Sequence, residues 1–521
     1  MKQLEPISIV APGFYGLNTQ ESSVTLSTNY ALVAENCVID QLGRLGARKG
    51  WTLLTPDGST ELSTQYVEGL FEHIDADNAS TILAAGNNKI MELQSGDTLV
   101  DITPVTYTIT NNNWKSANVL DTSLLVQTEH EPLVYCNGAS ADIQTLSDYL
   151  SNEKGITDSP SFRTSYPNDV IAAYGRYWVH DGSTVYWSTD IADSTFPAFS
   201  GGTSGTLNIS AVLPKNVDNI VALASHNNFL IIFCERNIVL YSGADNPLDK
   251  FALHDVITGV GCIARDSVQA TGDDIFFLSD TGVRSLGRVI QEKSLPMHEL
   301  TLNVRDEFIE LLNTELATNG SSKICSVYSE NNAFYLISLP SLSTVYCLDT
   351  RQRLESGASR VTMWTKHKIM SFLRTRDRAV YLGKQSGIGV YEGYQDNGVP
   401  YRMRFSSAYI DMNASTTKKL LKRINTIVIG GSGQIFVIKA GYDYFGPAFS
   451  YSFTINEGGV YEYGIAEYAL SEYAAGVLVD KLSTPALGTG EVVQIGFEAN
   501  VDGAALSVQR LDIFVKTGRI N

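Results

Sequence analysis

The chain has 521 residues, of which 44% are hydrophobic and 18% charged. A chain this apolar can bury enough surface to offset the entropy lost on ordering, which excludes an intrinsically disordered acidic tail. Its formal net charge of -18 argues against a protein that grips the phosphate backbone of DNA, because that affinity depends on lysine and arginine displacing counterions.

The first 60 residues predict an N-terminal arm and a hairpin. A polar stretch over residues 17–29 precedes ENCVIDQLGRLGARKGW, which turns around Gly43. Glu5 and Pro6 interrupt the apolar run that a signal peptide needs, and no apolar run approaches the roughly 20 residues of a membrane span. We therefore expect a protein without a membrane span that is made and assembled in the cytoplasm.

Residues 61–400 repeat one local pattern seven times, a short apolar strand, a polar turn and a second strand that usually carries tyrosine. The repeats begin at Ile82, Leu124, Tyr177, Leu230, Ile275, Phe334 and Val380. Neighbouring starts lie 42 to 59 residues apart, and a further apolar stretch precedes most of them. This spacing is typical of propeller blades, so the sequence predicts an all-β fold with a β-propeller of about seven irregular blades. The alternative interpretation is a run of hairpins in sandwiches.

One segment, at about residues 300–318, breaks the β pattern. Its apolar side chains recur at helical spacing, Thr301 or Asn303 can cap the start, and Asn319–Gly320 supplies a stop. We predict a helix inserted between two blades, with its apolar face packed on the propeller.

Residues 401–521 predict a separate C-terminal domain that resembles a β-sandwich, because longer alternating strands are separated by Gly, Asn and Asp turns. Eleven basic and eleven acidic residues balance here, so the negative excess lies entirely in residues 1–400. A basic cluster without an aromatic platform and a tyrosine-rich stretch are candidate contacts with another subunit or a partner. The candidate contact residues are Lys418, Lys419, Lys422, Arg423, Tyr461, Tyr463, Tyr468 and Tyr473.

The motifs that suggest chemistry are incomplete. Asp280-Thr281-Gly282 lacks the second triplet of an aspartic protease, and Asp75 with Asp77 lacks the glycine and glutamate of a calcium loop. The six cysteines include no CxxC pair, and we expect them to be buried thiols. The sequence therefore predicts no enzyme, no catalytic residue, no cofactor and no metal site.

The order of strands and turns resembles the tail nozzle or tail hub proteins of short-tailed bacteriophages (podoviruses), including the packaged-DNA stabilisation type. The resemblance rests on the entry segment Ala11–Trp51, on GRYWVHDGSTVYWSTDIADSTFPAF, on NNFLIIFCERNIVLYSG and on GVGCIARDSVQATGDDIFFLSDTGVRSL. It spans most of residues 10–400. The C-terminal domain matches the family less clearly.

This resemblance implies a structural virion protein, located in the phage tail and assembled in the host cytoplasm. Six copies would form a ring at the head-to-tail connection, below the portal and adaptor proteins, that extends the DNA ejection channel, helps retain packaged DNA and anchors tail fibres or spikes. Double-stranded DNA would pass through without specific binding, and an acidic surface suits that passage because like charges do not adhere.

A second hypothesis from a different class is a glycan-binding or glycan-hydrolysing β-propeller. It rests on loop acids such as Asp190, Asp193 and Asp274, which loops on one face of a propeller can bring together. The two hypotheses differ in stoichiometry and partners.

Overall fold

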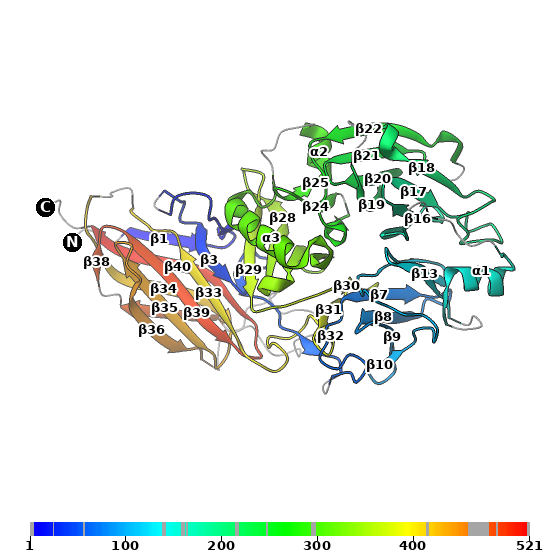
Figure 1. The fold of residues 1–521 in the computed structure, drawn as a ribbon. Coiled ribbons are helices and arrows are strands. Elements are labelled where there is room, and N and C mark those ends of the chain that lie inside the picture. Colours follow the sequence, from blue (N-terminus) through cyan, green and yellow to red (C-terminus); the bar gives the residue numbers. More distant parts are fainter. Residues whose placement is uncertain are drawn as a thin grey trace.

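The computed structural model describes residues 5–23, 25–55, 58–137, 142–157, 162, 165–213, 218–245, 248–272, 274–292, 299–412, 416–456, 479–485 and 488–517. Most elements in these residues are strands, which confirms the predicted all-β class. Figure 1 shows two bodies: a ring of small sheets from the middle of the chain, and a body of longer strands that combines N-terminal and C-terminal residues.

Six separate sheets of three or four strands form blades of a β-propeller, so the predicted propeller is confirmed. The first two contain β7 (Gly69–Ile74), β8 (Ser80–Gly86), β9 (Lys89–Gln94), β10 (Thr98–Asp101), and β11 (Lys115–Val119), β12 (Thr122–Gln127), β13 (His130–Tyr135), β14 (Ile143–Thr145). The next two contain β15 (Asp169–Ala173), β16 (Arg176–Asp181), β17 (Thr184–Trp187), β18 (Gly205–Asn208), and β19 (Ile220–His226), β20 (Phe229–Cys234), β21 (Asn237–Ser242), β22 (Ala252–Thr258). The last two contain β23 (Gln269–Ala270), β24 (Ile275–Ser279), β25 (Gly282–Ser285), and β30 (Phe372–Arg374), β31 (Val380–Lys384), β32 (Gly387–Val390), β6 (Thr52–Leu53).

Local sequence explains the blades. Neighbouring strands are antiparallel and alternate apolar residues toward the adjacent blade; Leu124 and Val126 of one blade, for example, share a core with Val170 and Val179 of the next. The last blade combines β6 with β30–β32, so a strand from before the repeats completes the sheet of the last repeat and closes the ring.

A ten-stranded sheet leaves the propeller and continues into the second body. Its strand order is β26 (Cys325–Ser329), β27 (Phe334–Leu339), β28 (Thr344–Arg353), β29 (Ser359–Thr365), β2 (Gly16–Leu17), β3 (Tyr30–Glu35), β33 (Tyr401–Ser407), β39 (Val493–Val501), β35 (Ile435–Tyr442), β36 (Pro447–Thr454). The strands beside the propeller, beginning with β26, and the far edge strand β36 therefore belong to one hydrogen-bonded sheet.

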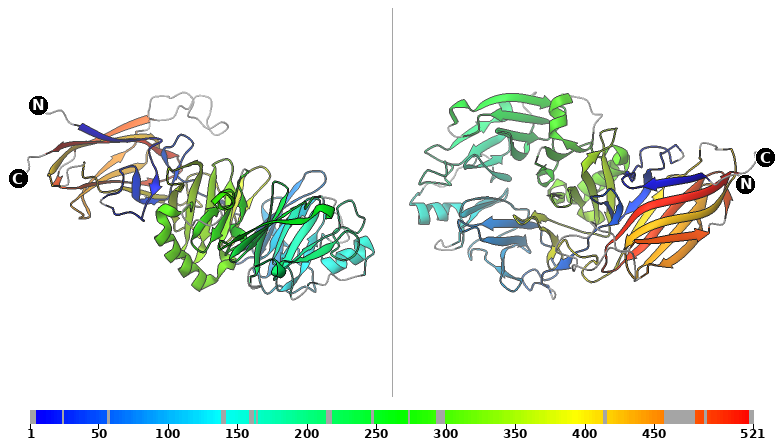
Figure 2. Two further views of the ribbon diagram at one scale, coloured as in Figure 1. Left: turned by 90° about the horizontal axis from the view of Figure 1, so that it is seen from above. Right: turned by 180° about the vertical axis from the view of Figure 1, so that it is seen from behind.

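A seven-stranded sheet packs against the outer half of the ten-stranded one (Figure 2). We call the seven-stranded sheet and the strands β2, β3, β33, β39, β35 and β36 of the ten-stranded sheet together the two-sheet body. The path of the seven-stranded sheet is β37 (Val479–Pro485), β34 (Lys419–Gly430), β40 (Leu506–Thr517), β5 (Leu45–Ala47), β4 (Cys37–Ile39), with β1 (Glu5–Val10) beside β40 and β38 (Thr489–Gly490) beside β34. Apolar side chains of both sheets share one core, in which Phe497 stacks on Phe405 and Phe436 at ring-centroid distances of 5.0 and 5.2 Å. The domain limits 1–60, 61–400 and 401–521 stay predictions.

The described residues contain α1 (Leu146–Lys154), α2 (Leu286–Glu292) and α3 (Arg305–Asn319). Helix α3 packs Phe308 edge-on against Tyr346 of β28, with ring centroids 5.0 Å apart, and Gly320 follows its last turn. The predicted capping by Thr301 or Asn303 is wrong, because the 3-10 turn η5 (Leu302–Val304) precedes the helix and Val304 takes the cap position without a side-chain bond.

Two further observations concern the sequence predictions. All six cysteines are free thiols; five are buried and Cys136 is half-buried. Across the described ranges, no helix is both long and apolar enough to cross a membrane.

Candidate functional site

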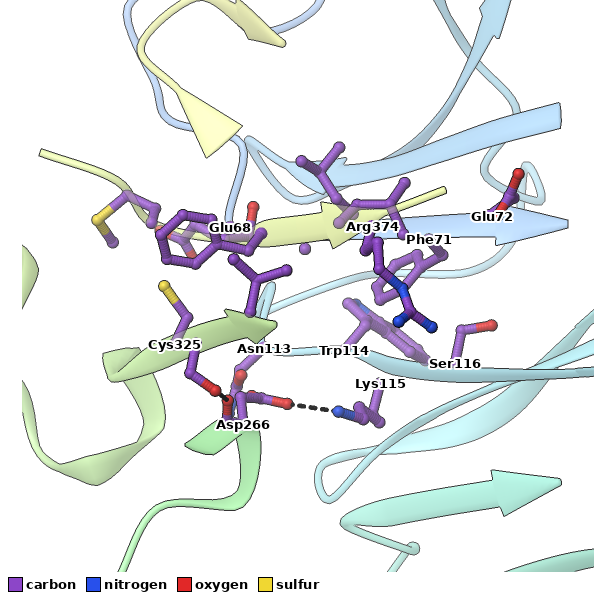
Figure 3. Close-up of a pocket in the computed structure, with 18 of the residues that line it drawn as sticks. Glu68, Phe71, Glu72, Asn113, Trp114, Lys115, Ser116, Asp266, Cys325 and Arg374 are labelled. Carbon is purple, nitrogen blue, oxygen red and sulfur yellow. Dashed lines mark hydrogen bonds and ion pairs between the residues drawn. The ribbon is translucent and has the colours of Figure 1, made fainter. Parts of the chain in front are cut away.

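The first strands of several repeats surround a cavity of about 340 Å³ on the propeller axis, which we call the axial cavity (Figure 3). Its walls come from β7, β11, β26 and β30, and from the 3-10 turn η4 (Arg265–Ser267) that leads into β23. Charged and polar side chains dominate the lining, among them Glu68, Glu72, Lys115, Asp266 and Ser326.

Two ion pairs join different repeats at the cavity. Lys115 Nζ of β11 lies 2.9 Å from Asp266 Oδ1 of η4 (Figure 3). Lys323, just before β26, has its Nζ 2.7 Å from Oε2 of Glu68, just before β7. Ser326 Oγ adds a hydrogen bond of 2.8 Å to the carbonyl oxygen of Asp266. The cavity is therefore crossed by contacts that tie four repeats together.

Asp266 is also held from behind by a buried arginine. Arg265 donates to Asp266 Oδ2 at 2.8 Å, to Asn113 Oδ1 at 2.8 Å and to the carbonyl oxygen of Asn168 at 2.7 Å. Burial alone would raise the pKa of Asp266, but attraction to Arg265 and Lys115 outweighs it and holds that pKa well below its usual range. This carboxylate stays ionised at neutral pH.

The remaining acid of the wall is engaged as well. Glu72 accepts hydrogen bonds from Ser80 Oγ at 2.7 Å and from the backbone N–H of Arg376 at 2.8 Å. A general acid needs a carboxyl group whose pKa is raised toward neutral, and Asp266 has the opposite shift. In the described parts of the chain, no group of three or more His, Cys, Asp or Glu side chains is arranged to hold a metal ion.

Sequence reasoning missed these axial residues, although the sequence contains a signal for them. A charged residue stands at or just before the first strand of six repeats: Glu68, Lys115, Asp169, Asp218, Asp266 and Lys323. The first strands of propeller blades face the axis, so charges at this recurring position meet there. Each repeat contributes only one or two such residues, of either sign, which hides the pattern from a search for dense motifs.

Three of the four residues of the predicted basic cluster are exposed and one is buried. Lys418, Lys422 and Arg423 are exposed, and a bulge of β34 between Leu421 and Arg423 interrupts the strict alternation of faces. Lys419 is fully buried, its Nζ donates to the carbonyl oxygen of Glu491 at 2.6 Å, and burial lowers its pKa. Lys419 is therefore not available to a partner, and the other three stay a prediction.

The predicted tyrosine contacts Tyr461, Tyr463, Tyr468 and Tyr473 lie outside the described residues.

The loop acids of the glycan hypothesis belong to different blades. Asp190 and Asp193 follow β17, where Arg176 lies 3.4 Å from Asp190 and Thr195 Oγ1 donates to Asp193 at 2.8 Å. Asp274 precedes β24, two blades further on, and accepts the backbone N–H of Gly287 at 2.8 Å. Each of these acids is engaged by other groups of the protein, and the glycan hypothesis stays a prediction.

No protein-family model matches this chain, and neither does any curated protein. Among solved structures, the chain is similar to the WD40 β-propeller domain of Doa1, at 10% identity and a TM-score of 0.33 over 63% of this chain and 95% of that one. It is also similar to YCF48 bound to D1 peptide, at 11% identity and a TM-score of 0.38 over 66% and 97%. PorZ, a surface component of the type-IX secretion system of Porphyromonas gingivalis, matches at 12% identity and a TM-score of 0.35 over 69% and 43%. At these identities the likeness concerns the fold alone.

Proposed function

We propose that this chain is a structural protein of a phage tail, a nozzle or hub subunit that assembles into a ring of six copies. The observation that carries the proposal is the sequence resemblance of residues 10–400 to that family, in which several segments recur in the same order. The charged groups of the axial cavity support a structural role, because they pair with one another across repeats.

We also propose a finer description of the fold. The four strands β26–β29 serve as a seventh blade, since β26 lies between β23 and β30 at the axis. The two-sheet body serves as a β-sandwich-like domain, since its sheets share one apolar core.

In this proposal DNA passes through the channel that the ring of copies encloses, and not along the axis of any single propeller. The axial cavity has a volume of only about 340 Å³ and is crossed by ion pairs, so it offers no open passage to a DNA duplex. The net charge of -18 supports a surface that DNA passes without adhering. Portal and adaptor proteins, and tail fibres or spikes, are the proposed partners.

Two chain segments and one shared sheet connect the propeller firmly to the two-sheet body, which supports a structural role. Two crossing segments, residues 48–51 and 393–397, are joined by backbone hydrogen bonds such as Trp51 N to the carbonyl oxygen of Gln395 at 2.9 Å. Arg48, fully buried, reaches both oxygens of Asp396 at 2.8 and 2.6 Å. The shared ten-stranded sheet is a second connection.

The experiment that tests the proposal combines the purified chain with the cognate portal and adaptor proteins, followed by light scattering and negative-stain imaging. We expect a closed ring seated below the adaptor. If the exposed surface at Lys422 and Arg423 faces an acidic neighbour in the ring, the charge reversal Lys422→Glu with Arg423→Glu should weaken ring formation. The matched control is Lys154→Glu with Arg236→Glu, which reverses two exposed cations of the propeller. A chain that binds sugars and never joins a ring would contradict the proposal.

A further inference from the structure

Strand β36 is the last strand of the ten-stranded sheet. Among the described strands it pairs with β35 alone and ends the ten-stranded sheet. None of its eight residues, PAFSYSFT, is charged, and none is buried. An edge of this kind presents a row of free backbone N–H and C=O groups to any chain that approaches.

The side chains of β36 add an aromatic row to this edge. Phe449, Tyr451 and Phe453 stand opposite Ala440, Ile438 and Phe436 of β35, whose side chains are buried, so the row faces the core side of the sheet. Tyr451 is nevertheless 45% exposed, because the row lies at the open margin of the two-sheet body.

Exposed apolar side chains concentrate in the hairpin of β35 and β36. Of the twelve large hydrophobic residues that are exposed in the described chain, four lie within its twenty residues: Ile435, Tyr444, Phe445 and Tyr451. Proteins protect edge strands with lysine, proline or a bulge. Here Pro447 and the bulge between Ala440 and Gly441 protect only the end near the turn. Residues 448–454 are therefore suited to pairing.

We propose that β36 pairs antiparallel with β36 of a second copy of this chain, about a two-fold axis. The charge distribution favours a second copy as the partner. Each chain has a net charge of -18, all of it from residues 1–400, so two copies repel each other there. They can approach at residues 401–521, where basic and acidic residues are equal in number and β36 itself is uncharged. The alternation is self-complementary. When Tyr451 faces its own copy across the axis, Phe449 faces Phe453, and the aromatic rows of both copies continue on one face.

This contact goes beyond the proposed tail function and does not rest on it. A two-fold contact joins two chains and cannot close a ring by itself, so ring formation uses other surfaces. The inference concerns the free chain, and its test needs neither portal nor adaptor.

The first test places like charges across the seam. Ser450 and Ser452 are exposed, on the face opposite the aromatic row, so Ser450→Lys with Ser452→Lys leaves the core intact and sets lysines against lysines in the pair. We expect light scattering to show a dimer of the wild-type chain that the variant weakens at least about tenfold. The matched control is Thr98→Lys with Val100→Lys, two exposed positions on the outer strand β10 of a blade.

The second test fixes the register. Tyr451→Cys should form a disulfide between two copies under mild oxidation, because facing residues of an antiparallel pair lie within disulfide reach. Val100→Cys should not, and the wild-type chain with its six native thiols gives the background. A wild-type chain that is monomeric at every concentration, a dimer that the lysine variant leaves intact, or an edge that pairs only with a different protein would each overturn the inference.

Discussion

The propeller and the two-sheet body differ in how deeply their ion pairs are buried. Several ion pairs of the propeller are buried: Arg176 with Asp190, Arg265 with Asp266 and Arg284 with Glu299 all have nearly buried guanidinium groups. In the two-sheet body, pairs such as Arg402 with Glu498 and Arg510 with Asp512 stand on the surface of the sheets. The propeller should therefore depend on individual charged residues for stability, whereas the two-sheet body should tolerate their loss.

The largest effect is expected at Arg48, where the two bodies join. Arg48→Met leaves Asp396 without its bidentate partner and removes the bond from Arg48 Nε to Asn36 Oδ1 at 3.1 Å. Breaking a buried pair by removing one partner costs about 3 kcal/mol or more, and Asp396 keeps some access to water, so we expect about 3 kcal/mol. Denaturant unfolding measures it, and a loss below about 1 kcal/mol would show that the junction does not depend on this pair.

Asp266→Asn tests the dependence of the propeller on its axial charges. The change leaves Arg265 buried without a carboxylate, and hydrogen bonds to charged groups contribute about 2 kcal/mol. Because the folded pKa of Asp266 is depressed, its stabilisation is present above the unfolded pKa of about 3.9 and is lost as the pH falls below that value. Urea titrations from pH 7 to pH 3 should therefore show wild type and variant converging in acid; parallel curves would contradict the assignment.

Lys384 extends the test to alkaline pH. Its ammonium is buried over the Trp51 ring at 4.5 Å, with Arg48 and Asp396 nearby, and burial lowers its pKa to about 7. Between about pH 7 and pH 10 the unfolded chain holds a proton that the folded chain has released, so stability rises with pH by about 1.4 kcal/mol per unit from this group. Lys384→Met should flatten that rise. An unchanged slope in the variant would mean that Lys384 is charged in the folded protein.

The sequence predicted what depends on local pattern and missed what depends on distant pairing. Alternation and turn residues around Ile82, Leu124 and the later repeats predicted the propeller, because each blade is built from consecutive strands. The local pattern could not predict that N-terminal strands join both large sheets. Strand β1, near the start of the sequence, pairs with β40, near its end. Lys419 was misjudged for the same reason, since its partner, the carbonyl of Glu491, is 72 residues away.

The smallest effect is expected at Arg510, whose exposed ion pair is the counterpart of the buried pair at Arg48. Arg510 Nε lies 2.7 Å from Asp512, nearly the distance that separates Arg48 from Asp396, yet 43% of its side chain is exposed against 0% for Arg48. Water already solvates the exposed pair, so Arg510→Met should change the free energy of unfolding by less than about 0.5 kcal/mol. Measured beside Arg48→Met in the same denaturant series, it separates the contribution of burial from that of distance. Equal losses in the two variants would show that burial does not decide how much these ion pairs stabilise the protein.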